Sequence, residues 1–177
     1  MKKLLALMLA LLLMVGMALA QALPQEEEIL IDLEEGVALT GEYLVEYGYD
    51  YYSTDEVALY LYAFGELPPN FITKKEARDL GWDSSKGNLW DVAYGLAIGG
   101  DKFGNHEGLL PEAEDRQYYE CDVNYAGGLR TSERIVFAND GGIYYTGDHY
   151  ETFELLYEDW YIEDYLYDPA LLYGDYM

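Results

Sequence analysis

The 177-residue sequence contains a single cysteine, Cys121, so no disulfide within the chain can stabilise the fold. A lone thiol could be a nucleophile, but a neutral cysteine that faces the core is commoner, and we expect that role here. Basic residues are also scarce, with 10 Lys and Arg against 34 Asp and Glu and a formal net charge of −24. This balance argues against a protein that attracts nucleic acid through its overall charge.

Long apolar runs are confined to the first 20 residues. Two lysines there precede an uncharged apolar stretch, residues 4–15, and a small-x-small sequence ends at Ala20. This pattern predicts a signal peptide over residues 1–20 and therefore a secreted, extracellular protein. Because the apolar stretch is short for a membrane span and the residue directly after the cleavage point is Gln21 and not cysteine, we expect no membrane anchor after cleavage.

Charge divides the rest of the chain into a mixed centre and acidic flanks. Beyond the signal peptide, every Lys and Arg lies between residues 74 and 134. The flanks, residues 21–52 and 158–177, are acidic and rich in Tyr and Leu, and they contain no Lys or Arg. Each flank could be a solvated, loosely ordered extension, with 21–52 a pro-segment or linker, or its Tyr and Leu could pack on the domain or a partner. Residues 53–157 are expected to form the one domain.

Capping patterns predict helices in the first half of this domain. A Ser or Thr followed three residues later by Glu occurs at Ser53 and at Thr73, and a helix is expected to begin after each. The first is expected over residues 54–64, the second ends at Gly81, and a third short helix is expected near 88–93.

Strand patterns dominate the second half. Strands are expected over residues 118–125, 134–138, 142–146 and 152–156. The sequence Asn139-Asp140-Gly141 predicts a hairpin between two of them. Helices followed by such strands predict an α+β fold, in which short N-terminal helices pack on a C-terminal antiparallel β-sheet.

Alternation in the first of these strands assigns its side chains to two faces. Glu120 and Asp122 share one face, and Cys121 lies on the opposite, core-facing side. A polar row of this kind can be plain solvent exposure. Arg130 and Arg134 follow closely, however, and are expected partners for Asp122. A glutamate gathered with arginines, a lysine and a histidine would suit phosphoryl chemistry, because it supplies a base, an acid and cations for the developing charge.

The centre of the chain carries long composite motifs. They read LPPNFITKKEARDLGWDSSKGNLWDVAYGLAIGGDKFGNHEGLLP, then YECDVNY, GLRTSERIVFANDG and IYYTGDHYETF. These motifs resemble those of the barnase-like enzymes in the microbial ribonuclease family, small secreted bacterial ribonucleases that prefer to cut after guanosine. The resemblance extends from about Asp55 to Leu156 and leaves both acidic flanks unexplained.

The resemblance implies an endoribonuclease that uses no metal and no cofactor. Glu120 would take the proton from the ribose 2′-OH, which attacks the phosphorus, and His149 would protonate the departing 5′ oxygen. The product would be a 2′,3′-cyclic phosphate. Lys74, Arg130 and Arg134 match the cations that stabilise the transition state. From the residues alone, His149 could be an ordinary surface residue and the cations ordinary partners of acids.

The resemblance also implies where substrate binds. The residues that match the guanine-binding loop are Phe103, Gly104, Asn105, His106 and Glu107, and Tyr150 matches a phosphate-contacting tyrosine. Glu107 would accept hydrogen bonds from the guanine N1–H and amino group. His106 stands where the family usually has arginine, so weaker and pH-dependent binding is expected. Asp101 and Asp122 are expected to hold the catalytic groups in place.

Expected partners are the RNA substrate and a barstar-like intracellular protein inhibitor, and the working expectation is a monomer. A second class of function stays open, an exported, non-catalytic binding or adhesive module on the same fold. The acidic flanks could also lie across the cationic cleft as a built-in, RNA-like inhibitor. We rank that idea below simple solvation, because acids within the domain would oppose the docking.

Overall fold

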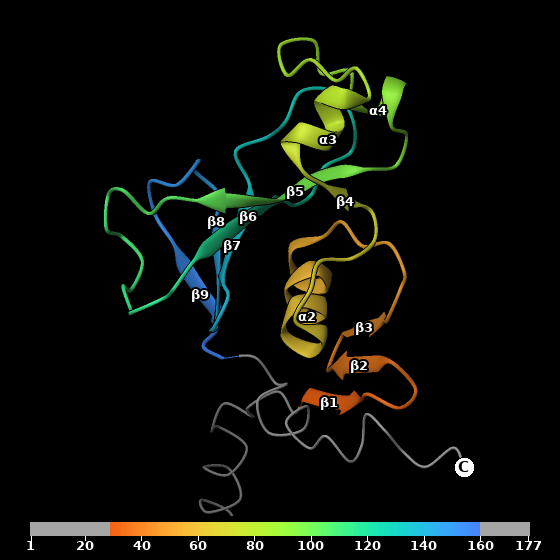
Figure 1. The fold of residues 1–177 in the computed structure, drawn as a ribbon. Coiled ribbons are helices and arrows are strands. Elements are labelled where there is room, and N and C mark those ends of the chain that lie inside the picture. The colour runs from red at the N-terminus through yellow and green to blue at the C-terminus, as the bar shows by residue number, and fades with distance from the viewer. Residues whose placement is uncertain (1–28, 160–177) are drawn as a thin grey trace, which may run out of the picture.

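Helix α2 (Thr54–Phe64) lies between two β-sheets in the computed structural model, which describes residues 29–159 (Figure 1). The Ser53 hydroxyl caps its start by accepting from the Glu56 N–H, and Gly65 ends it with a left-handed φ of 69°. Apolar residues occur all round this helix, with these buried: Val57, Ala58, Leu59, Tyr60, Leu61 and Ala63. A helix that is apolar on every side has to be covered on more than one side.

The larger sheet has six strands in the order β4-β5-β6-β7-β8-β9. They are β4 (Phe71–Ile72), β5 (Ala97–Phe103), β6 (Tyr118–Asp122), β7 (Arg134–Ala138), β8 (Gly141–Thr146) and β9 (Glu154–Tyr157). All neighbours are antiparallel except β4 and β5, which pair in parallel. Cys121 is 1% exposed and packs in the core that this sheet forms with α2, which confirms the expected place of the thiol.

Two short helices precede β5 and share a second core with it. Thr73 forms a complete capping box with Glu76 at the start of α3 (Lys74–Asp79), and α4 is Leu89–Val92. The predicted helices, the hairpin between β7 and β8 and the α+β fold are therefore confirmed. The sequence reading missed β4 and β5 and extended the strand at Tyr118 too far, since β6 ends at Asp122.

A small antiparallel sheet covers the other side of α2 (Figure 1). Its strands are β1 (Ile29–Asp32), β2 (Val37–Thr40) and β3 (Tyr43–Glu46). Ala38 and Val45 are fully buried on its inner face and form one cluster with Leu59, Tyr60 and Ala63 of α2. The adjoining loop is tied down as well, because the Gly48 N–H donates to the Tyr60 hydroxyl at 3.0 Å.

Residues 29–46 of the N-terminal flank pack against α2. Their buried side chains cover α2 on the side that faces away from the larger sheet. The small sheet lies at the end of the molecule away from α3 and β5 (Figure 1). The signal peptide predicted over 1–20 and the tail from residue 160 onward lie outside the described residues. Within 29–159, no helix is long and apolar enough to cross a membrane.

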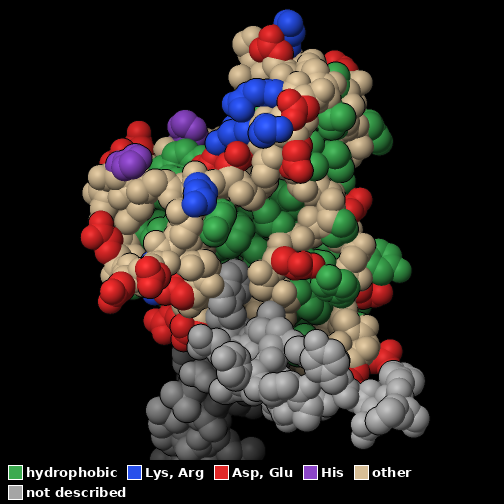
Figure 2. All heavy atoms as spheres, viewed as in Figure 1, with side chains coloured by type: hydrophobic (Ala, Val, Ile, Leu, Met, Phe, Trp, Pro, Cys, Tyr) green, Lys and Arg blue, Asp and Glu red, His purple; other side chains and the backbone are tan. Residues whose placement is uncertain are grey.

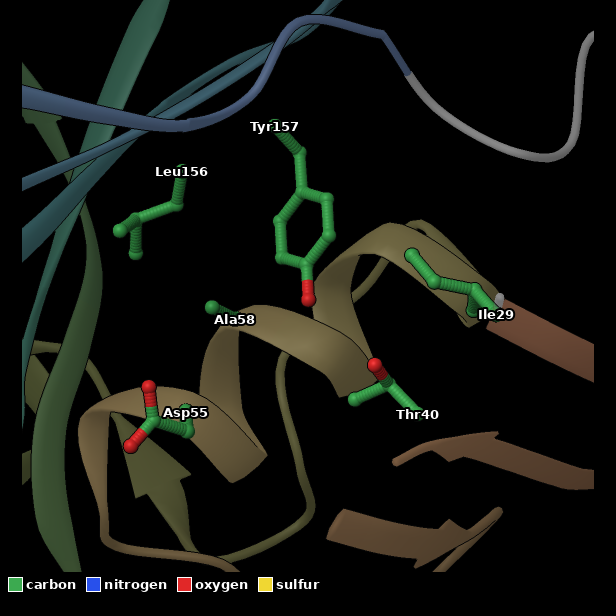
Figure 3. A pocket seen from close by; sticks show the side chains of 6 residues that line it. All are labelled: Ile29, Thr40, Asp55, Ala58, Leu156 and Tyr157. Carbon is green, nitrogen blue, oxygen red and sulfur yellow. The ribbon is translucent and has the colours of Figure 1, made fainter. Parts of the chain in front are cut away.

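A pocket of about 300 Å³ lies where the small sheet, α2 and β9 meet (Figure 3). Its lining residues are Ile29, Thr40, Asp55, Ala58, Leu156 and Tyr157. The Tyr157 ring stacks on Tyr62 at a centroid distance of 4.5 Å. None of the residues that the sequence assigns to the functional site lines this pocket, so it belongs to the junction between the two sheets.

Substitutions at adjacent residues of β3 test the packing of the small sheet. Val45→Asp places a charge against α2 at a position that is fully buried, whereas Leu44→Asp changes a side chain that is 52% exposed on the opposite face. We expect Val45→Asp to lower the free energy of unfolding by well over the ~1 kcal/mol of an average substitution, and Leu44→Asp to change it by less than about 0.5 kcal/mol. Thermal unfolding followed by circular dichroism measures both; equal, small effects would contradict the packing described.

Candidate active site

Glu120 is the centre of a group of charged side chains on β6, β7 and the start of α3. Its carboxylate is 8% exposed; Oε1 forms an ion pair with Lys74 Nζ, and Oε2 accepts from the Tyr150 hydroxyl at 2.5 Å. Burial acts to raise the pKa of Glu120, but the hydrogen bonds from Lys74 and Tyr150 and the charges of Lys74 and Arg130 outweigh it. The pKa therefore lies below its ordinary value, and the group is a carboxylate at neutral pH.

Asp122 is the second buried acid on this face of β6, 2% exposed. Arg130 donates two hydrogen bonds to it, from Nε to Oδ2 and from Nη2 to Oδ1, each at 2.6 Å. Arg134 Nε lies 2.9 Å from Asp122 Oδ1, near enough for an ion pair. Its N–H is not aligned on that oxygen, and this buried nitrogen has no hydrogen-bond partner among the described residues. Asp122 thus holds two arginines beside Glu120.

The position of Lys74 depends on Asp101 and a bulge in β5. The pairing of β5 with β6 shifts between Gly99 and Asp101, with Gly100 at a left-handed φ of 87°, and Asp101 lies opposite Glu120. Asp101 Oδ2 accepts from the Lys74 backbone N–H at 2.8 Å. This contact fixes Lys74, the first residue of α3, against β5. Because Asp101 lies opposite Glu120 on β6, the Lys74 side chain can reach the Glu120 carboxylate.

His149 and Tyr150 lie side by side in the loop after β8. Both are outside the usual region for residues with a Cβ, with φ of 62° and 75°, and their ring centroids are 4.8 Å apart. Burial first, and then the hydrogen bond to Glu120, raise the pKa of Tyr150, which keeps its hydroxyl a donor. Tyr150 also lies 5.1 Å from the Phe103 ring, so it links the loop to the end of β5. His149 is exposed.

The predicted base-binding loop begins at Phe103 and is closed by the side chain of Asn105. The Asn105 amide donates to Leu110 O at 2.9 Å, and its oxygen accepts from the Leu110 N–H at 3.0 Å. Asn105 itself has a φ of 45°. The His106 ring folds over Gly104 and fills the space where a Cβ would lie. His106 and Glu107 are both exposed.

A cavity of about 320 Å³ lies behind this loop, between it and the start of β6. Its lining includes Arg116 and Gln117 but neither Glu120 nor His149, so it is separate from the charged group. Figure 2 shows the face of the molecule on which most basic side chains gather. The main cluster of Lys and Arg side chains gathers near α3 with acidic groups between them, and both histidines lie on the same face. Within residues 29–159, no three His, Cys, Asp or Glu side chains are arranged to hold a metal ion.

The structure therefore brings most of the site predicted from the sequence together. Hydrogen bonds and ion pairs join seven of its members in two neighbouring sets. One set is Asp101, Lys74, Glu120 and Tyr150, and the other is Asp122, Arg130 and Arg134. The polar face of β6 is buried, so the reading of simple solvent exposure was wrong. Sequence reasoning missed Trp82, whose ring lies 6.0 Å from the Arg130 guanidinium, and Asp148, which organises the His149 loop. The Thr-x-Asp-x-x-x-Thr spacing at 146–152 was the available signal for Asp148.

Comparison with known proteins agrees with this arrangement. The profile of a ribonuclease family matches residues 56–157. A ribonuclease of Heyndrickxia coagulans is 52% identical over 99 residues, which are 56% of this chain and 91% of that protein. A ribonuclease of Bacillus intermedius has the same identity over 99 residues but is matched over 61% of its length. A guanyl-specific ribonuclease St of Saccharopolyspora erythraea is 40% identical over 57 residues, 32% of this chain and 56% of that protein.

The small N-terminal sheet precedes the matched region, whereas Glu120, its cationic neighbours and the two loops beside it all lie inside that region. The match covers more than half of the chain, and the buried carboxylate with its cations lies at the centre of it. The chain therefore belongs to the ribonuclease family of barnase-like microbial enzymes.

Proposed function

We propose that this ribonuclease cuts single-stranded RNA on the 3′ side of guanosine by transesterification, without a metal ion. The observation that carries the proposal is the environment of Glu120. A carboxylate that is almost fully buried is kept ionised by Lys74 and Tyr150, with the charge of Arg130 next to it. An ionised carboxylate surrounded by cations is suited to take a proton from a group attached to a phosphodiester.

The first step assigns Glu120 as the base. It removes the proton from the ribose 2′-OH while that oxygen attacks the adjacent phosphorus, and negative charge grows on the phosphoryl oxygens. Lys74, Arg130 and Arg134 are held near Glu120 and stabilise that charge without moving, because Asp101 and Asp122 already fix them. The reaction needs the 2′-OH, so RNA is a substrate and DNA is not.

His149 is the acid in this proposal. It gives a proton to the departing 5′ oxygen, so the bond between phosphorus and that oxygen breaks as the 2′,3′-cyclic phosphate forms. Its exposed position at the edge of the charged group leaves space for the leaving nucleoside. Hydrolysis of the cyclic product then uses the same two groups with their roles exchanged.

Guanine is proposed to bind at the loop that Asn105 closes. The two hydrogen bonds between Asn105 and Leu110 hold the loop in shape before the base arrives. Glu107 is exposed on that loop, where its carboxylate would accept from the two donors of guanine and repel the acceptor of adenine. The name of the guanyl-specific relative supports this preference.

Export belongs to the proposal as well. The basic, apolar and small-residue pattern of residues 1–20 supports it. An RNA-degrading enzyme is hazardous in the cytosol before it leaves, so we also propose a small intracellular protein inhibitor that covers the cationic site. The enzyme itself is proposed to act as a monomer.

The role of Glu120 is tested with Glu120→Gln, which keeps the size of the side chain but removes the base. We expect its kcat on RNA in the presence of a chelator to fall at least about hundredfold. Glu114→Gln, which changes an exposed loop carboxylate, is the matched control and should keep full activity. Cleavage is followed on an RNA oligonucleotide that contains one guanosine. If the wild type and both variants are equally inactive, the non-catalytic binding module becomes the better account.

Base preference is tested with Glu107→Gln. The glutamine retains one acceptor but loses the charge and the second acceptor, so the ratio of kcat/KM for GpU over ApU should fall by about tenfold or more. Glu114→Gln changes an exposed carboxylate that does not line the cavity behind the loop, and it should leave the ratio as it is. An unchanged ratio in Glu107→Gln would show that the loop backbone alone selects the base.

His106 is tested by restoring the cation. Arginine carries a permanent positive charge and presents several N–H donors in a fixed plane, as the family usually has at this position. His106→Arg should lower KM for GpU about twofold to fivefold, the effect of an exposed charge pair worth up to about 1 kcal/mol. An unchanged KM in His106→Arg would contradict the idea that a permanent cation at this position strengthens substrate binding.

A further inference from the structure

Asp148 lies immediately before His149 and touches nothing that the proposed reaction uses, yet its carboxylate is fully engaged. Oδ1 accepts from the Thr146 hydroxyl at 2.9 Å and from the backbone N–H groups of Glu151 and Thr152 at 3.0 and 2.9 Å. Oδ2 accepts from the Thr152 hydroxyl at 2.6 Å. One exposed side chain thus joins the end of β8 to the residues on the far side of His149 and Tyr150.

The two residues inside this loop adopt a backbone conformation that is costly for them. His149 and Tyr150 have consecutive positive φ values of 62° and 75°, and neither is glycine. Such a conformation persists only where its surroundings impose it. The Asp148 contacts close the loop on both sides of the pair, at Thr146 and at Thr152, and so impose it.

Tyr150 has anchors of its own, whereas His149 has few. The Tyr150 hydroxyl is held by Glu120, its ring packs near Phe103, and its N–H donates to the Thr146 hydroxyl at 3.0 Å. Within residues 29–159, the exposed His149 side chain makes no hydrogen bond and contacts the Tyr150 ring. The direction of the imidazole therefore depends on the backbone that Asp148 holds.

We propose that Asp148 is a positioning residue for the general acid, and that it aims His149 at the leaving 5′ oxygen by fixing the loop from residue 146 to residue 152. This inference rests on the proposed function. Hydrogen bonds from Thr152, first by its hydroxyl and then by its N–H, lower the pKa of Asp148 to about 2. The carboxylate is therefore an acceptor at every pH where the enzyme would work, and the restraint on His149 is constant.

The test compares two guanosine 3′-phosphodiesters under the same conditions. In GpU the leaving group is a strongly basic alkoxide that needs the acid, whereas guanosine 3′-(4-nitrophenyl phosphate) releases a weakly basic phenolate that does not. Both need the base. Asp148→Ala should lower kcat for GpU about tenfold to hundredfold, with KM within about twofold, and lower kcat for the nitrophenyl ester less than about threefold.

Conservative and remote variants separate positioning from general stability. Asp148→Asn keeps an acceptor for the two N–H groups and should retain at least about a third of the GpU activity. Asp32→Ala removes a carboxylate with a similar role in the turn after β1, where it accepts from the N–H groups of Glu34 and Glu35 at 3.1 Å each. This variant should leave kcat unchanged for both substrates. Thr152→Val, which keeps the carboxylate and removes one donor, should show the same selective loss on a smaller scale.

Circular dichroism is used to check that each variant is folded at the assay temperature. If Asp148→Ala is unfolded, the ratio of the losses that Thr152→Val shows on the two substrates tests the proposal instead. Equal losses on both substrates, a change in KM alone, or no loss on GpU would each overturn the proposal for Asp148. His149→Ala tests the proposed function separately. If it shows the selective loss on GpU and Asp148→Ala does not, only the positioning role falls. If the wild type cleaves neither ester, the proposed function falls, and the role of Asp148 with it.

Discussion

The structure depends on the pairing of two buried carboxylates, Glu120 and Asp122, with cations from other parts of the chain. A carboxylate that loses water is costly unless a partner compensates it, and removing one partner leaves the other charge unpaired. Lys74 comes from the start of α3, Arg130 from the loop after β6, and Arg134 from β7. The strand order and the bulge in β5 are what bring these distant residues to one face. The same ion pairs that satisfy the fold thus place three cations at the site proposed for the phosphate.

The distribution of charge explains how a protein with a net charge of −24 can belong to a ribonuclease family. The cations gather near α3 and the edge of the large sheet, while the small N-terminal sheet lies at the opposite end of the molecule (Figures 1 and 2). Charges at a distance act weakly through salt solution, whereas partly buried neighbours act strongly. The local arrangement around Glu120 therefore matters more for RNA than the total. The small sheet has a structural reason to exist, because it covers the apolar outer face of α2.

Several parts of this account could be predicted from the sequence because their signals are local. The capping boxes at Ser53 and Thr73 specify helix starts through contacts three residues apart, and the alternation around Glu120 specifies the two faces of a strand. The composite motifs predicted the family. In contrast, β4 consists of two residues whose strand character comes only from pairing with β5, which lies more than twenty residues later. Composition gave no sign of that partner. The Tyr and Leu content of the N-terminal flank suggested that it could pack on the domain, but not that residues 29–46 form a sheet against α2.

The buried Glu120 carboxylate and its cations are proposed to support attack by a ribose 2′-OH on phosphorus. Phosphorus NMR of GpU cleavage by the wild-type protein in the presence of EDTA tests this role most directly. The account predicts that the resonance of guanosine 2′,3′-cyclic phosphate appears first and accumulates before any 3′-phosphate forms. Direct formation of the 3′-phosphate with no cyclic product, or the absence of cleavage, would contradict it.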